Sequence, residues 1–247
     1  MRRFIIALQF LTIIPYDKDL KVTEEDLGKS MLFFPLVGLF IGGCLVFSDK
    51  ILSLLLPLSV VNGLLITLLV LFTGSMHLDA LADTIDGIAG GGDKTEKLRI
   101  MKEGNIGAMG AVGIIIVLML KFLTLNDLPQ TLKCQSLLIM LMMARWSQVT
   151  VSYFSDYAGL KKGLGFPFTK HAKFFTFILT TLIAVLFSYL LFLGKGILIA
   201  GLILLICFTY SRFFKRILGG VTGDILGAIN EIVEVTVLIM ILLLFTK

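Results

Sequence analysis

Three aspartates lie close together in the segment HLDALADTID, residues 77–86, which follows a long apolar run. Asp79, Asp83 and Asp86 are spaced i, i+4 and i+7, so on a helix their carboxylates fall within about 60° of one another. Such carboxylates repel each other unless a cation lies between them. Oxygen ligands without a thiolate suit magnesium, with manganese as the alternative, and magnesium commonly binds together with a phosphate-bearing substrate. The spacing therefore indicates a metal site, and the structural alternative is a solvated helix end.

A basic segment follows the aspartates, after the glycine-rich break at residues 87–93. Its cations could bind phosphate groups, with help from the backbone amides of the glycine-rich turns. For any single lysine, a role in setting membrane topology explains its presence nearly as well. The four cations are Lys94, Lys97, Arg99 and Lys102.

A third charged group occupies residues 212–234, RFFKRILGGVTGDILGAINEIVE. Asp224 and Glu231 are seven residues apart, so they share a face if a helix begins at the Thr222-Gly223-Asp224 turn. Charged side chains inside a membrane helix are costly and mostly functional. By the same reasoning Arg145, within the apolar run 134–154, is expected to face the bundle and to meet a carboxylate or a phosphate, with a purely structural ion pair as the alternative. The other polar residues of the group are Arg212, Lys215, Arg216, Asn230 and Glu234.

The elements that position these residues are expected to be membrane helices. The chain has 247 residues, 57% hydrophobic and only 16% charged, and its mean hydropathy is +0.98. Apolar runs recur at the length of about 20 residues that a helix needs to cross a bilayer. The sequence therefore predicts an all-α, polytopic bundle forming one domain over residues 1–247, with about seven spans. These are expected at 31–48, 51–74, 107–125, 134–154, 173–193, 196–211 and 231–246.

The first fifteen residues, MRRFIIALQFLTIIP, predict a short additional helix that lies at the membrane interface or dips into it. The connections between spans differ in charge. Sixteen lysines and arginines fall on the side of the N-terminal segment and residues 77–104, 155–172 and 212–230, with Lys173 at the start of the next span counted among them, against four on the other side. The protein is expected to lie in the cell membrane, and this bias predicts that the first side faces the cytoplasm. The three scattered cysteines predict neither a disulfide framework nor a zinc site.

Three blocks of the sequence resemble one family. FTGSMHLDALADTIDG resembles the TGG-x-HLDGLADT-x-DG signature of cobalamin synthase, the membrane-embedded adenosylcobinamide-GDP ribazoletransferase family. LRIMKEGNIGAMG is similar to that family's IM-(K/R)-D-x-x-(I/L)-G turn, and LGGVTGDILGAINEIVE to its LGG-x-TGD-x-LGA-x-x-E-x-x-E block. KKGLGFPF matches a weaker feature. The three blocks occur in the family's order and spacing, which makes the match specific. Because the length, the number of spans and the N-terminal FLTIIP segment also fit, the resemblance covers nearly the whole chain.

The resemblance implies a reaction. The alcohol of α-ribazole, or of its 5′-phosphate, attacks the phosphate next to the aminopropanol arm of adenosylcobinamide-GDP; GMP leaves, and adenosylcobalamin or its 5′-phosphate forms. His77 or one of the carboxylates would take the proton of the nucleophile. No nucleic-acid partner is implied, and a homo-oligomer is left open. Phe166, Phe168, Trp146 and Tyr153 could provide an apolar surface for the corrinoid. The alternative is that they anchor the protein at the membrane interface, which is the more common role of such aromatic residues.

The resemblance also implies site residues. The metal ligands would be Asp79, Asp83, Asp86 and Asp224. The catalytic group would comprise His77, Asp83, Asp86, Glu103 and Asp224. The contacts to phosphates and substrate would be Arg99, Lys102, Arg145, Lys215, Arg216, Thr222 and Glu231.

The chain departs from the family pattern at several positions. Glu103 stands where the family has aspartate, and Asn105 where an arginine is common, so Lys102 or Arg99 would replace that phosphate contact. Ser75 replaces the second glycine of TGG, and Ala80 replaces the glycine of HLDG.

Two other functions remain as alternatives. A CDP-alcohol phosphotransferase also holds a metal and a nucleotide diphosphate with aspartates on membrane helices, but its signature spaces these residues differently. A cation or corrinoid transporter would use acidic groups in apolar helices. Transporters usually place such groups near the midplane of broken helices, whereas here the acids cluster on one side.

Overall fold

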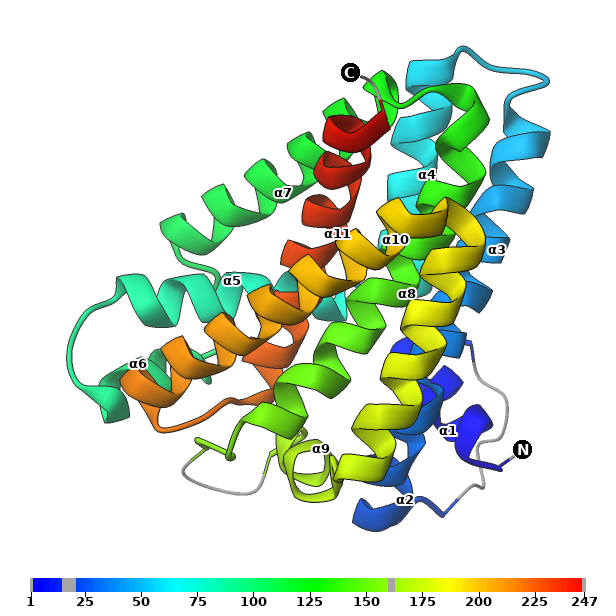
Figure 1. The fold of residues 1–247 in the computed structure, drawn as a ribbon. Helices are drawn as coiled ribbons and strands as arrows, with labels where there is room; N and C mark the ends of the chain where they lie inside the picture. Colours follow the sequence, from blue (N-terminus) through cyan, green and yellow to red (C-terminus); the bar gives the residue numbers. More distant parts are fainter. Residues whose placement is uncertain (1, 15–20, 160–162, 246–247) are drawn as a thin grey trace.

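The computed structural model describes residues 2–14, 21–159 and 163–245, and their regular elements are helices (Figure 1). This confirms the all-α class. In chain order the elements are α1 (Arg2–Leu11), α2 (Glu24–Ser30), the 3-10 helix η1 (Met31–Phe33), α3 (Phe34–Leu52), α4 (Leu58–Phe72), α5 (Met76–Ala89), α6 (Lys94–Ile100), α7 (Ala108–Asp127), α8 (Gln130–Phe154), α9 (Gly165–His171), α10 (Phe174–Leu218) and α11 (Gly223–Phe245).

The protein is a membrane protein by the length and hydropathy of its helices. Five stretches are long and apolar enough to cross a bilayer: Glu24–Leu52, α7, α8, α10 and α11. The pair α4 and α5 forms a sixth if it is one span, and it bends by 85° at the break between the two helices. The count of about seven spans stays a prediction.

Helix α10 contains two of the expected spans. Its 45 residues are interrupted at Leu193, where φ is 52° and ψ is −136°, and Figure 1 shows the chain turning back on itself there. A side chain at Gly196 would place its Cβ 1.9 Å from the carbonyl oxygen of Ser188. The break therefore lies at the last residue of the expected segment 173–193, just before the expected segment 196–211.

Several predicted boundaries are wrong, and the starts of the second and the last span are two of them. The second span was expected at 51–74, but α3 continues to Leu52 and α4 begins only at Leu58. Pro57, in an extended conformation at the N-cap of α4, separates the two, because proline favours a helix start and is disfavoured inside one. The last span was expected from residue 231, whereas α11 begins at Gly223, so the Thr222-Gly223-Asp224 turn does start a helix.

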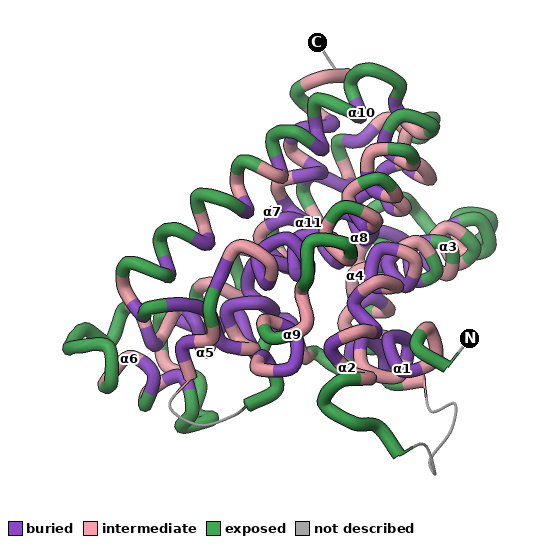
Figure 2. The backbone as a smooth tube through the Cα atoms, turned by 60° about the horizontal axis from the view of Figure 1, so that its bottom comes forward, coloured by how far each residue is buried: buried purple, intermediate pink, exposed green. Residues whose placement is uncertain are grey.

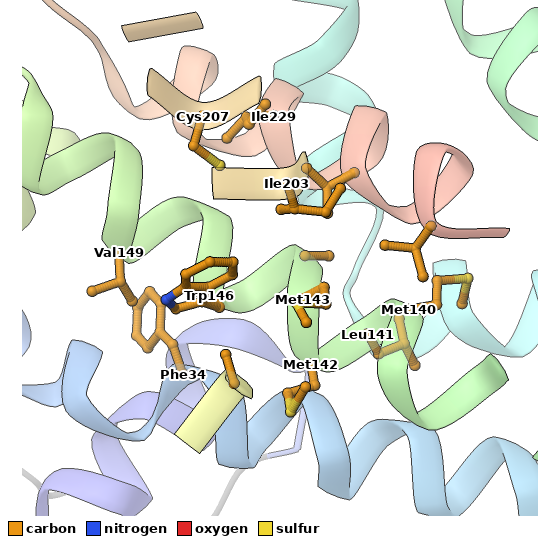
Figure 3. Close-up of a cluster of buried hydrophobic side chains, with 14 of the residues drawn as sticks. Phe34, Met140, Leu141, Met142, Met143, Trp146, Val149, Ile203, Cys207 and Ile229 are labelled. Atoms are coloured by element: carbon orange, nitrogen blue, oxygen red, sulfur yellow. The ribbon is translucent and has the colours of Figure 1, made fainter. Parts of the chain in front are cut away.

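The core lies along α8, which packs against α3, α10 and α11. Figure 3 shows Trp146 of α8 beside Phe34 of α3, with Ile203 and Cys207 of α10 on the other side. The buried stretches in Figure 2 likewise gather around α8 and α11, whereas α6 is mostly exposed or half-buried. This packing fixes α8 and α11 as the frame on which the polar residues are held.

The polar segments gather at one end of the bundle. Helices α1, α2, α6 and α9 lie at this end, and the C-terminus lies at the other (Figure 1). Helix α1 is the short N-terminal helix expected from the sequence, and it packs on α2 and α3. The segments that carry most of the positive charge therefore share one end of the molecule.

Candidate active site

A cavity of about 300 Å³ lies at the end of the bundle that carries the positively charged segments. Five of the polar residues that the sequence singled out line it, although α5 and α11 are about 140 positions apart in the chain. They are His77 and Asp79 of α5, Lys102 after α6, and Thr222 and Asp224 at the start of α11. The fold thus brings the three polar segments of the sequence to one place.

Close packing of α5 on α11 makes this meeting possible. At Gly227 of α11 an added Cβ would lie 2.4 Å from the Cβ of Ala80 on α5. Because small residues let helix backbones approach closely, the first turns of both helices face the same space. The family has glycine at the position of Ala80. The alanine methyl group fits between the two helices here because residue 227, opposite it, is a glycine.

The turn that joins α4 to α5 has an unusual backbone conformation. Gly74 has φ 58° and Ser75 has φ 60°, the left-handed region that non-glycine residues adopt at a cost. This pair of residues produces the sharp bend that lays α5 across α11 and α7. The family's glycine at residue 75 suits this conformation better than the serine found here.

Asp224 is held at the N-terminus of α11. The Thr222 hydroxyl lies 3.2 Å from the Asp224 carboxylate, to which it donates, and accepts from the amide of Ile225 at 3.4 Å. A Cβ at Gly165 would lie 2.6 Å from the backbone nitrogen of Gly223. The Gly163-Leu164-Gly165 segment at the start of α9 therefore fits against the turn that presents Asp224 to the cavity.

The acidic residues of the two helices act on one another electrostatically. Asp83, half-buried one turn beyond Asp79, is repelled by Asp79, Asp224 and Asp86. Asp224 is repelled by Asp79 and attracted by Lys102. Among the described residues neither Asp79 nor Asp83 has a salt-bridge partner. The site therefore carries excess negative charge, which a cation would relieve.

The carboxylates fit a magnesium ion that shares its coordination with a substrate. Within the described part of the chain, no group of three or more His, Cys, Asp or Glu side chains is arranged to hold a metal by itself. Magnesium does not require such a group, because it usually binds through one or two carboxylates, waters and substrate phosphates. Asp79 and Asp224, which line the same cavity, supply two.

Asp86 has a structural role that the sequence did not reveal. Its two carboxylate oxygens accept hydrogen bonds from the amides of Gly107 and Gly110, at 2.7 and 2.8 Å. A Cβ at Gly110 would lie 2.3 Å from the same carboxylate. Asp86 thus binds the free amides at the N-terminus of α7. Its parts in metal binding and catalysis stay predictions.

Several expected phosphate contacts lie outside the described lining of the cavity. Arg99 is exposed on α6 and pairs with Glu96 and Glu103, and its hydrogen bond lowers the pKa of Glu96. Lys215 is exposed and lies 2.9 Å from Asp156, and Arg216 is exposed at the end of α10. Of the expected basic residues only Lys102 lines the cavity, and the roles of the others stay predictions.

A buried ion network lies behind the cavity. Arg145 is fully buried and pairs with Glu234, which confirms that it faces the bundle and meets a carboxylate. Lys121 of α7 binds Glu231 at 2.7 Å and also Glu234. Sequence reasoning missed Lys121. A single lysine within the expected span 107–125 could have indicated a buried ion pair, because charged residues inside membrane helices usually face the bundle and pair with an opposite charge. The phosphate-binding roles of Arg145 and Glu231 stay predictions.

His77 is almost fully buried and borders the cavity. Its Nε2 lies 2.9 Å from the amide nitrogen of Gln148, and its Nδ1 has no hydrogen-bond partner among the described residues. Gln148, which sequence reasoning also missed, carries no charge and so gave no signal in an apolar run. Of the four suggested aromatic contacts, Phe168 lines the cavity, whereas Trp146 belongs to the core and donates to Thr181.

Comparisons with known proteins agree with one another. The family described as "Cobalamin-5-phosphate synthase" matches residues 3–242. A protein of Geotalea daltonii named "Adenosylcobinamide-GDP ribazoletransferase" is 40% identical over 235 residues, 95% of this chain and 94% of its own. Proteins of the same name from Acinetobacter baumannii and Caldanaerobacter subterraneus are 40% and 34% identical, and each alignment covers at least 94% of both chains. No solved structure matches the chain.

Proposed function

Because the chain belongs to the cobalamin-5-phosphate synthase family, we propose that it joins adenosylcobinamide-GDP to α-ribazole or its 5′-phosphate and releases GMP. The product is adenosylcobalamin or its 5′-phosphate. The observation that carries the proposal is the cavity in which His77, Asp79, Lys102 and Asp224 meet. These residue types are the ones that a transfer between a diphosphate and an alcohol requires.

The transfer proceeds by attack of the ribazole alcohol on the phosphorus next to the aminopropanol arm. A new phosphorus–oxygen bond forms, the bond to the bridging oxygen of the diphosphate breaks, and GMP leaves with that oxygen. The proton of the alcohol passes to His77 or to the Asp79 carboxylate, both of which line the cavity. Lys102 contacts the phosphate oxygens. Because phosphoryl transfer depends mostly on positioning and electrostatics, no covalent enzyme intermediate is needed.

Asp79 of α5 and Asp224 of α11 are the proposed magnesium ligands, with Asp83 one turn beyond Asp79 on α5. A divalent ion bound to these carboxylates and to the diphosphate would neutralise the charge that develops on the leaving phosphate. The excess negative charge of the site and the absence of a salt-bridge partner for Asp79 and Asp83 among the described residues support this assignment. Manganese, which accepts similar ligands, would be the substitute.

The orientation is part of the same proposal. The end of the bundle with the cavity faces the cytoplasm, and the protein lies in the cell membrane. The excess of lysine and arginine at this end supports the orientation. A nucleotide-bearing substrate then reaches the site from the compartment that holds nucleotides.

The test is product formation by the purified protein. Protein in detergent is incubated with adenosylcobinamide-GDP, α-ribazole 5′-phosphate and magnesium, and the cobamide is measured by liquid chromatography and mass spectrometry. Asp79→Asn should lower turnover about a hundredfold or more, as expected for loss of a group that stabilises developing charge. Asp93→Asn is the matched control, because Asp93 is an exposed N-cap residue of α6 and asparagine caps equally well.

The proposal fails if the wild-type protein forms no cobamide and releases no GMP under these conditions. It fails in its site assignment if Asp79→Asn retains the turnover of Asp93→Asn. Uptake of a cation or corrinoid into sealed vesicles without GMP release would favour the transporter instead.

A further inference from the structure

The cavity has an aromatic end in addition to its polar end. Phe10 of α1, Phe34 of α3 and Phe168 of α9 all line it. The Phe168 ring meets the other two edge-on, with centroids 4.9 Å from Phe10 and 5.5 Å from Phe34. The Phe10 and Phe34 rings are nearly parallel, 11° apart, with centroids 6.1 Å from each other. Three separate elements thus build one aromatic wall.

The aromatic wall and the acidic residues face one continuous space. Its polar end is formed by Asp79, Lys102 and Asp224, and its apolar end by the three phenylalanines. A ligand that fills the space must therefore carry a planar apolar group at one end and, at the other, a group that reaches the reacting phosphate. Aromatic walls bind such planar groups through stacked and edge-on contacts.

The size of the cavity selects between the two substrates. About 300 Å³ is at the small end of the range for ligand pockets, roughly 300–1,000 Å³. That space accommodates a nucleoside with one small base, whereas a corrin macrocycle is too large for it. The nucleoside is also the substrate whose hydroxyl must come next to the phosphate.

We propose that the wall of Phe10, Phe34 and Phe168 binds the aromatic base of the ribazole, so that its sugar hydroxyl points towards Asp79 and Asp224. The corrinoid then stays outside, and only its diphosphate arm enters the polar end. This inference rests on the proposed function and extends it by assigning a place to each substrate. It also predicts that the wall determines which bases the enzyme accepts.

The test is a comparison of Phe168→Leu with Phe192→Leu. Both phenylalanines are nearly fully buried, 4% and 5% exposed, but Phe192 packs on Phe245 away from the cavity. Phe168→Leu should raise the KM for α-ribazole roughly three- to tenfold, which matches the strength of an aromatic contact. The KM for adenosylcobinamide-GDP should stay within about twofold. Phe192→Leu should leave both constants unchanged.

A second measurement uses the size of the base. Probes are α-ribazoles whose benzimidazole base carries no, one or two methyl groups. Because leucine is smaller than phenylalanine, Phe168→Leu should shift the ratio of kcat/KM values towards the more methylated base, whereas Phe192→Leu should not. Far-UV circular dichroism and size-exclusion chromatography establish that both variants fold. If Phe168→Leu does not fold, Phe10→Leu replaces it, since Phe10 is only half-buried.

Three outcomes would overturn the inference while the wild-type enzyme remains active. These are an unchanged KM for α-ribazole in a folded variant, a raised KM for adenosylcobinamide-GDP alone, and an unchanged preference among the bases. An apolar lipid tail in the cavity would give the first result, and the corrin ring would give the second. Failure of the proposed function itself looks different, because the wild-type protein then forms no cobamide.

Discussion

Removing Lys121 is expected to destabilise the protein strongly. Lys121 is 3% exposed and neutralises two buried carboxylates, Glu231 at 2.7 Å and Glu234. Methionine has nearly the same length, so Lys121→Met removes the charge without leaving a large cavity. Glu234 then keeps Arg145 as a partner, whereas Glu231 loses the salt bridge that it has among the described residues. Removing one partner of a buried pair typically costs about 3–5 kcal/mol, because an uncompensated charge stays in the interior.

A double variant separates charge from packing. Lys121→Met combined with Glu231→Gln removes one positive and one negative charge, and leaves Arg145 paired with Glu234. If charge balance is what matters, the double variant should regain about 2 kcal/mol or more relative to the sum of the two single losses. The assay is denaturant unfolding in detergent micelles, monitored by far-UV circular dichroism. The slope of the unfolding free energy against denaturant concentration is compared between variants.

Two results would refute this reasoning. One is a loss of less than about 0.5 kcal/mol for Lys121→Met, the range of ordinary surface substitutions. The other is strict additivity of the two single variants, which would mean that Lys121 and Glu231 do not act together.

Three further predictions concern the site and its orientation. Ser75→Gly should stabilise the protein by about 1 kcal/mol in the same unfolding assay, because glycine relieves the left-handed conformation of residue 75; a lower stability would contradict this. Asp224→Asn should raise the magnesium concentration for half-maximal activity at least about tenfold; an unchanged midpoint would remove Asp224 from the metal site. Single cysteines at positions 93 and 219 should react with a membrane-impermeant maleimide only in opened cells, and labelling in intact cells would reverse the orientation.

The structural features that the sequence predicted correctly are those that depend on the helix period or on the cost of a buried charge. The helical spacing of Asp79 and Asp83 is realised on α5, and the Thr222-Gly223-Asp224 turn begins α11. Arg145 was expected to meet a carboxylate or a phosphate because an unpaired charge is costly in an apolar helix, and Glu234 provides a carboxylate. Such inferences need only the helix period and the cost of buried charge.

The contacts that the sequence could not reveal depend on which helices meet. The two hydrogen bonds of Asp86 come from Gly107 and Gly110, on a different helix. Nothing in the spacing of the three aspartates distinguishes this one from the others. Gln148 likewise acquires significance only from its contact with His77. The aromatic wall is a further case, because no periodic pattern joins residues from α1, α3 and α9.

The most direct test of the central claim is the dependence of GMP release on the second substrate. Purified protein is given adenosylcobinamide-GDP and magnesium, with and without α-ribazole 5′-phosphate, and GMP and cobamide are quantified over the same time course. Direct transfer in the cavity between α5 and α11 predicts one cobamide for each GMP, and no GMP above background without the ribazole. GMP release at the same rate without the ribazole would contradict the account, because the diphosphate would then be cleaved independently of the alcohol.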